Sequence, residues 1–165
     1  MTDVTREPQI RTQIAPGDIG YVIYLHGILY AREFNLDHTF EAGVARGLGE
    51  FAGGYDPSKD LFAVAEIDGR IVGSIVIAAE SDELAKLRYF LVHPDARGHG
   101  LGRRLMQQAL DFCRERGFRS VWLWTISELK TAAHLYREMG FKVTEEKTHE
   151  IWGAIRTEQR YDLTL

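Results

Sequence analysis

The sequence predicts one mixed, mostly antiparallel central sheet with helices on both faces, an α/β fold of the α+β type. Two apolar runs, LFAVAEI and RIVGSIVIAAE, flank an Asp-Gly dipeptide, which is a strong signal for a β-hairpin. Later periodic segments each end at a glycine or a proline. The predicted order is strand, two helices, three strands, helix, strand, helix and two strands.

The first part of the chain is expected to form a short strand, QIRTQI, and two helices. Asp18 is expected to cap a helix over residues 19–34. Asp37 is expected to cap a second helix over residues 38–52, with Glu41 near its start, where negative charge is favourable. The loop GGYDPSKD then leads into the hairpin.

The second half is predicted to complete the sheet. LAKLRYFLV predicts a strand that Pro94 stops, and the apolar spacing over residues 100–117 predicts a helix. The strand RSVWLWTI, the helix ELKTAAHLYREMG and two closing strands, FKVTEE and IRTEQRYDLTL, follow.

Composition limits the class of protein. A chain of 165 residues suits one domain, 1–165, whose residues 1–7 are expected to be flexible. The formal net charge of −4 argues against a nucleic-acid binder, and no apolar run approaches the roughly 20 residues of a membrane span. The single cysteine, Cys113, excludes an internal disulfide. With no apolar stretch like a signal peptide at the N-terminus, this predicts a cytoplasmic protein with neither nucleic-acid nor membrane partners.

A glycine-rich loop, HPDARGHGLGRRL, joins a predicted strand to a predicted helix. Backbone N–H groups at a helix start, approached closely through glycines, form an anion site that suits phosphate. Arg97 and Arg103 would add positive charge. The dinucleotide pattern G-x-G-x-x-G would need glycine at Arg103 or Leu105, and Walker A needs a Gly-Lys-Ser/Thr that is absent. A glycine-rich turn with a solvated basic flank is the alternative.

The arrangement of Arg97, Gly100 and Gly102 resembles the acetyl-CoA pyrophosphate loop, R-x-x-G-x-G, of the GNAT superfamily of N-acetyltransferases. Downstream, AAHLYREMGFKV is similar to the second motif of that superfamily, and the resemblance covers residues 8–165. Residues 16–45 resemble the acetyltransferase domains that are fused to MarR-type regulators.

The resemblance implies a GNAT fold and acetyl-CoA as cosubstrate. The residues it implies for cofactor binding are Leu91, Val92, Arg97, Gly98, His99, Gly100, Leu101, Gly102, Arg103 and Tyr136. Tyr136 matches the tyrosine that protonates the coenzyme A thiolate, whereas helical spacing alone would favour a packing role. Leu129 replaces an asparagine that often contacts the cofactor, so that contact is in question, and Ser127 or Thr125 are candidate substitutes.

Acceptor residues are sought on the two N-terminal helices. Glu33 and Glu41 are candidate general bases, and His26 and Tyr30 are candidate substrate-binding residues. Arg88 could bind an acceptor carboxylate or face solvent. For each of these residues, solvated charge or ordinary packing is the alternative.

The remaining special residues have simpler interpretations. His93 and His99 lack metal-ligand spacing, so no metal is predicted. Cys113 is expected in the core, and Trp122 and Trp124 are expected to pack on one face of a strand. Trp152 could cover an acceptor pocket or lie at a homodimer contact.

The sequence therefore predicts an acetyl-CoA-dependent N-acetyltransferase that acts directly on an amine of an unidentified acceptor. A small-molecule acceptor is the preferred hypothesis. The alternatives are a protein or peptide N-acetyltransferase and an acyl-CoA sensor with little turnover.

Overall fold

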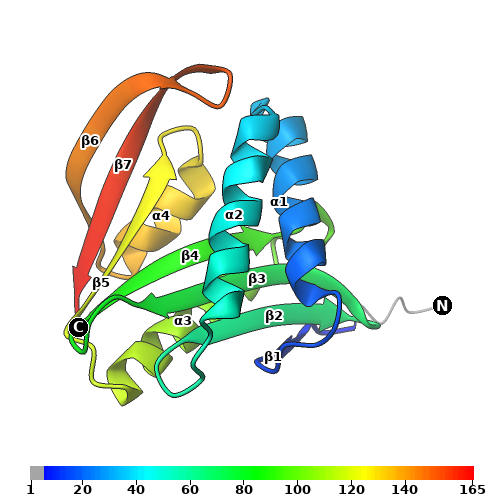
Figure 1. Ribbon diagram of the computed structural model, residues 1–165, viewed down its shortest axis with the longest axis vertical. Helices are drawn as coiled ribbons and strands as arrows, with labels where there is room; N and C mark the ends of the chain where they lie inside the picture. Colours follow the sequence, from blue (N-terminus) through cyan, green and yellow to red (C-terminus); the bar gives the residue numbers. More distant parts are fainter. Residues whose placement is uncertain (1–5) are drawn as a thin grey trace.

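A computed structural model describes residues 6–165, so residues 1–5 of the segment expected to be flexible lie outside it. Seven strands form one sheet in the order β1-β2-β3-β4-β5-β7-β6 (Figure 1). The predicted order of elements is confirmed. The elements are β1 Gln9–Arg11, α1 Asp18–Phe34, α2 His38–Gly53, β2 Leu61–Ile67, β3 Arg70–Ala79, β4 Leu84–Val92, a 3-10 turn Pro94–Ala96, α3 Leu101–Glu115, β5 Ser120–Ile126, α4 Lys130–Glu138, β6 Lys142–Ile151 and β7 Ala154–Thr164.

The β2–β3 hairpin forms as its sequence predicts. Asp68 and Gly69 have φ values of 52° and 77°, and β2 and β3 pair antiparallel from Ile67 opposite Arg70. Both turn residues therefore occupy the left-handed region that a two-residue hairpin turn requires, which is why an Asp-Gly pair suits this position.

The two N-terminal helices begin differently. Asp37 caps α2 as predicted, because its carboxylate accepts a hydrogen bond from the Thr39 N–H at 3.0 Å. The prediction for α1 was wrong: Gly17 is the N-cap residue and Asp18 lies in the first turn. The Asp18 carboxylate instead accepts a hydrogen bond from Ala15 N–H and pairs with Arg11 of β1, which fastens the helix start to the sheet edge.

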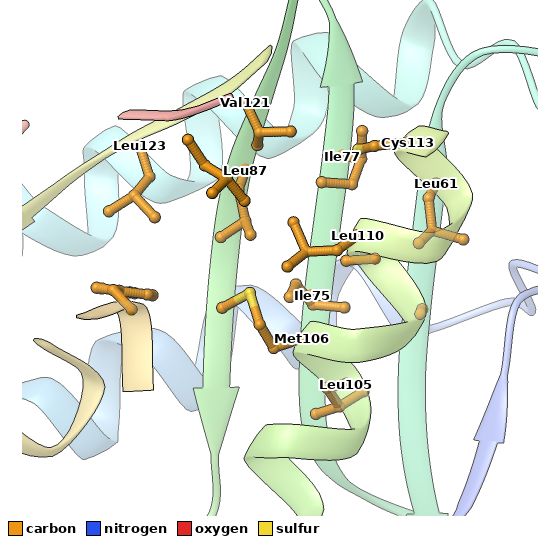
Figure 2. Close-up of a cluster of buried hydrophobic side chains, with 14 of the residues drawn as sticks. Leu61, Ile75, Ile77, Leu87, Leu105, Met106, Leu110, Cys113, Val121 and Leu123 are labelled. Carbon is orange, nitrogen blue, oxygen red and sulfur yellow. The ribbon is translucent and has the colours of Figure 1, made fainter. Parts of the chain in front are cut away.

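Each face of the sheet has its own core. Figure 2 shows the core beneath α3, where Leu105, Met106 and Leu110 pack against Ile75 and Ile77 of β3. The predicted core position of Cys113 is confirmed, since its side chain is fully buried there and burial raises the pKa of its thiol to about 12. On the opposite face, α1 and α2 cover β2, β3 and β4 through a second apolar cluster.

The sheet opens between β4 and β5. These parallel neighbours pair only over Leu84–Lys86 and Ser120–Trp122, so the later part of each strand is unpaired along that edge. A bulge also interrupts the pairing of β4 with β3, where Tyr89 has a φ of 51°. The Ser74 hydroxyl donates to the Tyr89 carbonyl at 2.7 Å and holds the bulge in place. The gap and the bulge together position the candidate site.

The β6–β7 hairpin is longer than predicted, and its tip reaches the loop between α1 and α2 (Figure 1). β6 runs five residues beyond the expected FKVTEE segment. The prediction was too short because the exposed, polar residues of β6 show little of the alternation that marks a half-buried strand. At the tip, the Trp152 carbonyl accepts a hydrogen bond from the Asp37 N–H at 3.2 Å. Within residues 6–165, no helix is both long enough and apolar enough to cross a membrane.

Candidate active site

Two neighbouring cavities lie beside the gap between β4 and β5. The loop cavity, of about 450 Å³, lies between the end of β4, the glycine-rich segment Gly98–Arg103 and α4. The aromatic cavity, of about 410 Å³, lies among α1, α2, β4, β5 and the β6–β7 hairpin. Tyr30, Phe90 and Leu129 contribute to the linings of both cavities, which therefore adjoin each other.

The glycine-rich segment presents backbone N–H groups to the loop cavity. Gly98 and Gly100 have φ values of 82° and 78°, a conformation that glycine adopts without strain. The first intrahelical bond of α3 joins Arg104 N–H to the Gly100 carbonyl at 3.0 Å. The N–H groups of the preceding three residues thus have no intrahelical acceptor, and with the helix dipole they form an anion site.

Gly102 allows the helix start to approach β4 closely. A Cβ atom at this position would lie 3.4 Å from Phe90 Cζ and 3.6 Å from Val92 Cγ2. A larger side chain would fill part of the space along the end of β4. Leu91 and Val92, two residues that the resemblance implies for cofactor binding, also line the loop cavity.

Both arginines of the loop are already paired with carboxylates that line the same cavity. Arg97 donates to Glu33 of α1, at 2.9 Å from Nη2 to Oε2, and its Nε donates to the Val92 carbonyl at 3.0 Å. Arg103 pairs with Glu138 of α4. Their positive charge is therefore partly neutralised, and the backbone N–H groups remain as the principal anion donors.

The aromatic cavity has walls of stacked rings. The Tyr30 ring lies 5.7 Å from His26 and 4.9 Å from Phe40, and Trp152 packs edge-on against Phe40 at 5.0 Å. Trp152 lines this cavity. Trp124 of β5 lines the opposite side.

Tyr136 reaches the aromatic cavity from α4. Its side chain is 5% exposed, and its ring packs 5.4 Å from Tyr161 and 5.9 Å from Phe141. Burial, with the neighbouring Tyr30 and Tyr161, holds the pKa of its hydroxyl well above the usual range. The hydroxyl therefore carries its proton at neutral pH and can donate it.

His26 presents an unpaired nitrogen in the lining of the same cavity. Its Nδ1 lies 2.8 Å from the Val22 carbonyl, which can only accept, so Nδ1 carries the hydrogen. The buried Nε2 then holds a lone pair, and it has no hydrogen-bond partner among residues 6–165. Burial lowers the pKa of His26 to about 4, so the ring is neutral at physiological pH.

Three cationic side chains line the aromatic cavity, against one carboxylate. Lys86 and Arg88 come from β4, Lys147 comes from β6, and the carboxylate is that of Glu158 on β7. Arg88 was expected either to bind an acceptor carboxylate or to face solvent. It is half-buried in this lining, with its guanidinium 4.8 Å from the Tyr89 ring centroid.

The two predicted carboxylate bases do not line the aromatic cavity. Glu33 lies in the loop cavity, where it pairs with Arg97. Glu41 lines neither of the two cavities; its carboxylate lies over Gly27 of α1, where an added Cβ would come within 1.8 Å of Oε1. The α1–α2 crossing thus takes up the side chain that was expected to face the acceptor.

Two further residues lie elsewhere than the sequence predicts. His99 is exposed and is not part of the loop cavity lining, and Tyr136 lines the aromatic rather than the loop cavity. Lys86, Lys147 and Glu158 were not singled out. The two-residue spacing of Lys86 and Arg88 on a predicted strand could have indicated a pair of cations, since it places both side chains on one face of the sheet. Across residues 6–165 there is no cluster of three or more metal-ligating side chains.

The sequence is similar to a known protein family and to individual proteins of other organisms. A sequence model described as the Acetyltransferase (GNAT) family matches residues 27–141. An uncharacterized N-acetyltransferase of Methanocaldococcus jannaschii is 34% identical over 93 residues, which are 53% of this chain and 41% of that protein. The streptothricin acetyltransferase of Streptomyces lavendulae is 35% identical over 91 residues, which are 54% of this chain and 48% of that protein. The chain thus spans about half or less of these two relatives.

Solved structures share the fold over nearly the whole chain. An acetyltransferase from Streptococcus agalactiae has a TM-score of 0.79 at 23% identity and covers 96% of this chain and 98% of its own. A GNAT family acetyltransferase from Elizabethkingia anophelis with acetyl-CoA bound has a TM-score of 0.67 at 14% identity, with the same coverage of both chains. At these identities the likeness concerns the fold alone.

Proposed function

Because this chain belongs to the GNAT family of acetyltransferases, we propose that it transfers an acetyl group directly from acetyl-CoA to the amine of an acceptor. The observation that carries the proposal is the placement of Tyr136. Its protonated hydroxyl lines a cavity that adjoins the anion-binding loop. In the proposal, the loop cavity takes acetyl-CoA and the aromatic cavity takes the acceptor.

The loop cavity has the donor set that a pyrophosphate needs. The unbonded N–H groups at the start of α3 would hold the phosphate oxygens, and the open edge of β4 near Leu91 and Val92 would lie along the rest of the molecule. Bound acetyl-CoA supplies the thioester that the amine attacks. Backbone N–H groups on the unpaired part of β4 would stabilise negative charge on the thioester oxygen.

Tyr136 would act as the general acid. Its hydroxyl would donate a proton to the sulfur atom as the thiolate leaves. Burial keeps the phenol protonated at neutral pH and also makes it a weaker acid, so the proton would be transferred only as negative charge develops on the sulfur atom. A sensor that only binds acyl-CoA would have no need of this donor.

On the acceptor side, His26 would receive a hydrogen bond from the attacking amine. Its Nε2 lone pair has no partner among the described residues, and the ring is held by Val22 and stacked on Tyr30. Glu158 is the carboxylate in the same lining and is the second candidate to take the amine proton, directly or through water. Both replace Glu33 and Glu41, whose positions do not suit the role.

The proposal also covers the domain organisation and the narrower family resemblance. We take the whole described chain, which forms one sheet with its covering helices, as a single catalytic domain. The narrower resemblance of residues 16–45 to the regulator-fused subgroup rests on that segment alone. It names no acceptor.

Two measurements test the proposed function. Calorimetry is expected to show acetyl-CoA binding, and release of free thiol is expected with at least one member of a panel of small amines and peptides. Binding without thiol release across the panel would favour the sensor alternative. Absence of acetyl-CoA binding by the folded protein would contradict the proposal.

A further inference from the structure

The charge of the aromatic cavity does not suit a purely cationic amine. Lys86, Arg88 and Lys147 face one carboxylate, that of Glu158. Glu158 already pairs with His149. Within residues 6–165, none of the three cations forms an ion pair with a carboxylate, although twelve ion pairs of other lysines and arginines occur in the same part of the chain. A polyamine would meet net repulsion here.

The cations are held in place by aromatic rings. The Lys86 Nζ lies 4.6 Å from the Trp122 ring centroid, and the Lys147 Nζ lies 5.6 Å from that of Trp124. Arg88 lies over Tyr89. These contacts orient the charged groups. The carboxylate of Glu80, which accepts a hydrogen bond from Trp122 Nε1, favours the charged form of Lys86 without forming an ion pair with it.

α2 makes room for Arg88. A Cβ atom on Gly47 would lie 2.7 Å from Arg88 Nη2 and 2.4 Å from the Tyr89 hydroxyl. The absence of a side chain at Gly47 therefore lets both groups lie against the helix. The Tyr89 hydroxyl is buried and has no hydrogen-bond partner in the described part of the chain, so it is a further polar group that a ligand could satisfy.

The proximity of the cationic side chains carries an electrostatic cost. Burial, followed by repulsion from Arg88, lowers the pKa of the Lys86 ammonium. Like charges gathered in a concave, half-buried site are stabilised when an anion binds among them. The cationic cluster and the residues with unpaired polar atoms thus both line the aromatic cavity.

We propose that the acceptor is an amino-acid-type molecule, a primary amine that also carries a carboxylate, bound through Arg88 and Lys86. This inference rests on the proposed acetyl transfer. The planar guanidinium can hold the carboxylate by paired hydrogen bonds. The amine would then point toward His26 Nε2, Thr125 Oγ1 and the Tyr136 hydroxyl, which line the same cavity. Both the His26 and Thr125 atoms are buried and unpartnered in residues 6–165.

The size and walls of the cavity suit such an acceptor. Its volume of about 410 Å³ lies within the range of small-molecule sites. Tyr30, Phe40 and Trp152 form apolar walls around the cationic end. Lys147 could hold a second carboxylate, so dicarboxylic amino acids belong to the expected class.

The test compares amines that are matched except for their carboxylate charge. L-Phenylalanine is compared with L-phenylalaninamide, L-glutamate with its diamide, and both acids with spermidine, by thiol release from acetyl-CoA. At least one carboxylated amine is expected to have a kcat/KM about 10- to 100-fold above that of its amide or of spermidine, because a charge-assisted hydrogen bond is lost. The amine of the amide is less basic, which alone would favour the amide, so the expected order cannot arise from amine reactivity.

Variants assign the effect to the cluster. Arg88→Met and Lys86→Met are each expected to raise the KM of the carboxylated amine by about 10-fold or more while leaving the KM of the amide within about two-fold. Arg119→Met, which removes a surface cation paired with Glu83, is the control and is expected to change neither. A fall in the KM of spermidine in the Arg88 variant would add support.

A binding measurement separates this proposal from the proposed function. Calorimetry with N-acetyl-L-phenylalanine, N-acetyl-L-glutamate and their amides reports charge selection without turnover. If the N-acetylated acids bind and Arg88→Met abolishes their binding, the acceptor class stands even where turnover is too slow to measure. If spermidine or the amides react or bind better than the acids, or if no acid binds, the acceptor class is wrong, whether or not acetyl-CoA binds.

Discussion

The loop cavity and the aromatic cavity recognise their ligands by different means. In the loop cavity, Arg97 and Arg103 are paired with Glu33 and Glu138, and the free groups are backbone N–H donors at the start of α3. In the aromatic cavity, the groups without a partner among residues 6–165 include side chains: the buried atoms of His26 and Thr125, and three cations that form no ion pair. The loop cavity depends on the conformation of a short segment, whereas the aromatic cavity depends on how seven elements come together.

This difference explains why acceptor specificity can change within one scaffold. Backbone donors tolerate exchange of most side chains and fix a common cosubstrate, whereas side chains on α1, α2, β4, β5, β6 and β7 can be exchanged singly. Tyr136 lines the aromatic cavity next to Phe90, which lines both cavities, and in the proposal it is the group that acts on both ligands. Changes there are expected to have the largest consequences.

The largest expected effect is that of Tyr136→Phe. Phenylalanine keeps the ring that packs on Phe141 and Tyr161 and removes the donor alone. Turnover is expected to fall by about 10²- to 10⁴-fold, with acetyl-CoA affinity unchanged. Steady-state kinetics and calorimetry measure the two quantities.

The matched control is Tyr24→Phe, which removes an exposed hydroxyl of α1 away from both cavities. It is expected to behave as the native protein. Native turnover in the Tyr136 variant, under conditions in which chemistry limits the rate, would mean that another group supplies the proton.

His26 gives the next largest effect, on stability rather than rate. Its pKa is lowered to about 4 in the folded protein, against an ordinary value of 6.5. Between these values the unfolded chain binds more protons, so the free energy of unfolding falls as the pH falls from 6.5 to 4. The loss should be roughly 3 kcal/mol in total. Urea unfolding at several pH values measures it.

Substitution identifies the residue responsible for that slope. His26→Gln is expected to flatten the dependence in this window, whatever its own stability at pH 7. His38→Gln, at an exposed position at the start of α2, is the control and is expected to retain it. An unchanged slope in the His26 variant would assign the acid sensitivity to other groups.

Gly100→Val tests the backbone character of the loop cavity. Valine is strained at the φ of 78° that Gly100 adopts, by about 1–2 kcal/mol, and its side chain would turn the N–H groups away from a phosphate. Acetyl-CoA affinity is expected to fall by about 10-fold or more. Gly69→Val carries a similar strain at a φ of 77° in the β2–β3 turn and should leave the affinity unchanged. Equal losses in both variants would indicate a global effect of strain.

The two cavities also differ in how far the sequence predicts them. The glycine loop and Tyr136 lie in short contiguous motifs, which were singled out by their resemblance to a family. The β2–β3 hairpin and the start of α2 follow from local turn and capping residues, whereas the start of α1 at Gly17 does not. Lys147 and Glu158 face each other only through the register of β6 and β7, and polar alternation in β6 carried too little signal to set its length. The sequence could not show that the Glu41 side chain lies over Gly27, because the close approach of α1 to α2 at that point depends on tertiary packing.

The smallest expected effect comes from the carboxylates once expected to act as bases. Glu33→Gln removes a negative charge from the lining of the loop cavity and releases Arg97 toward a phosphate. Because exposed ion pairs contribute about 0–1 kcal/mol, acetyl-CoA affinity is expected to rise by no more than about five-fold, and the gain should shrink at high salt. The KM of the acceptor should not change. Glu41→Gln, whose carboxylate lies between α1 and α2, should alter neither quantity and serves as the control. A higher acceptor KM in the Glu33 variant, with unchanged acetyl-CoA affinity, would instead place Glu33 in acceptor recognition and would break the division between the two cavities.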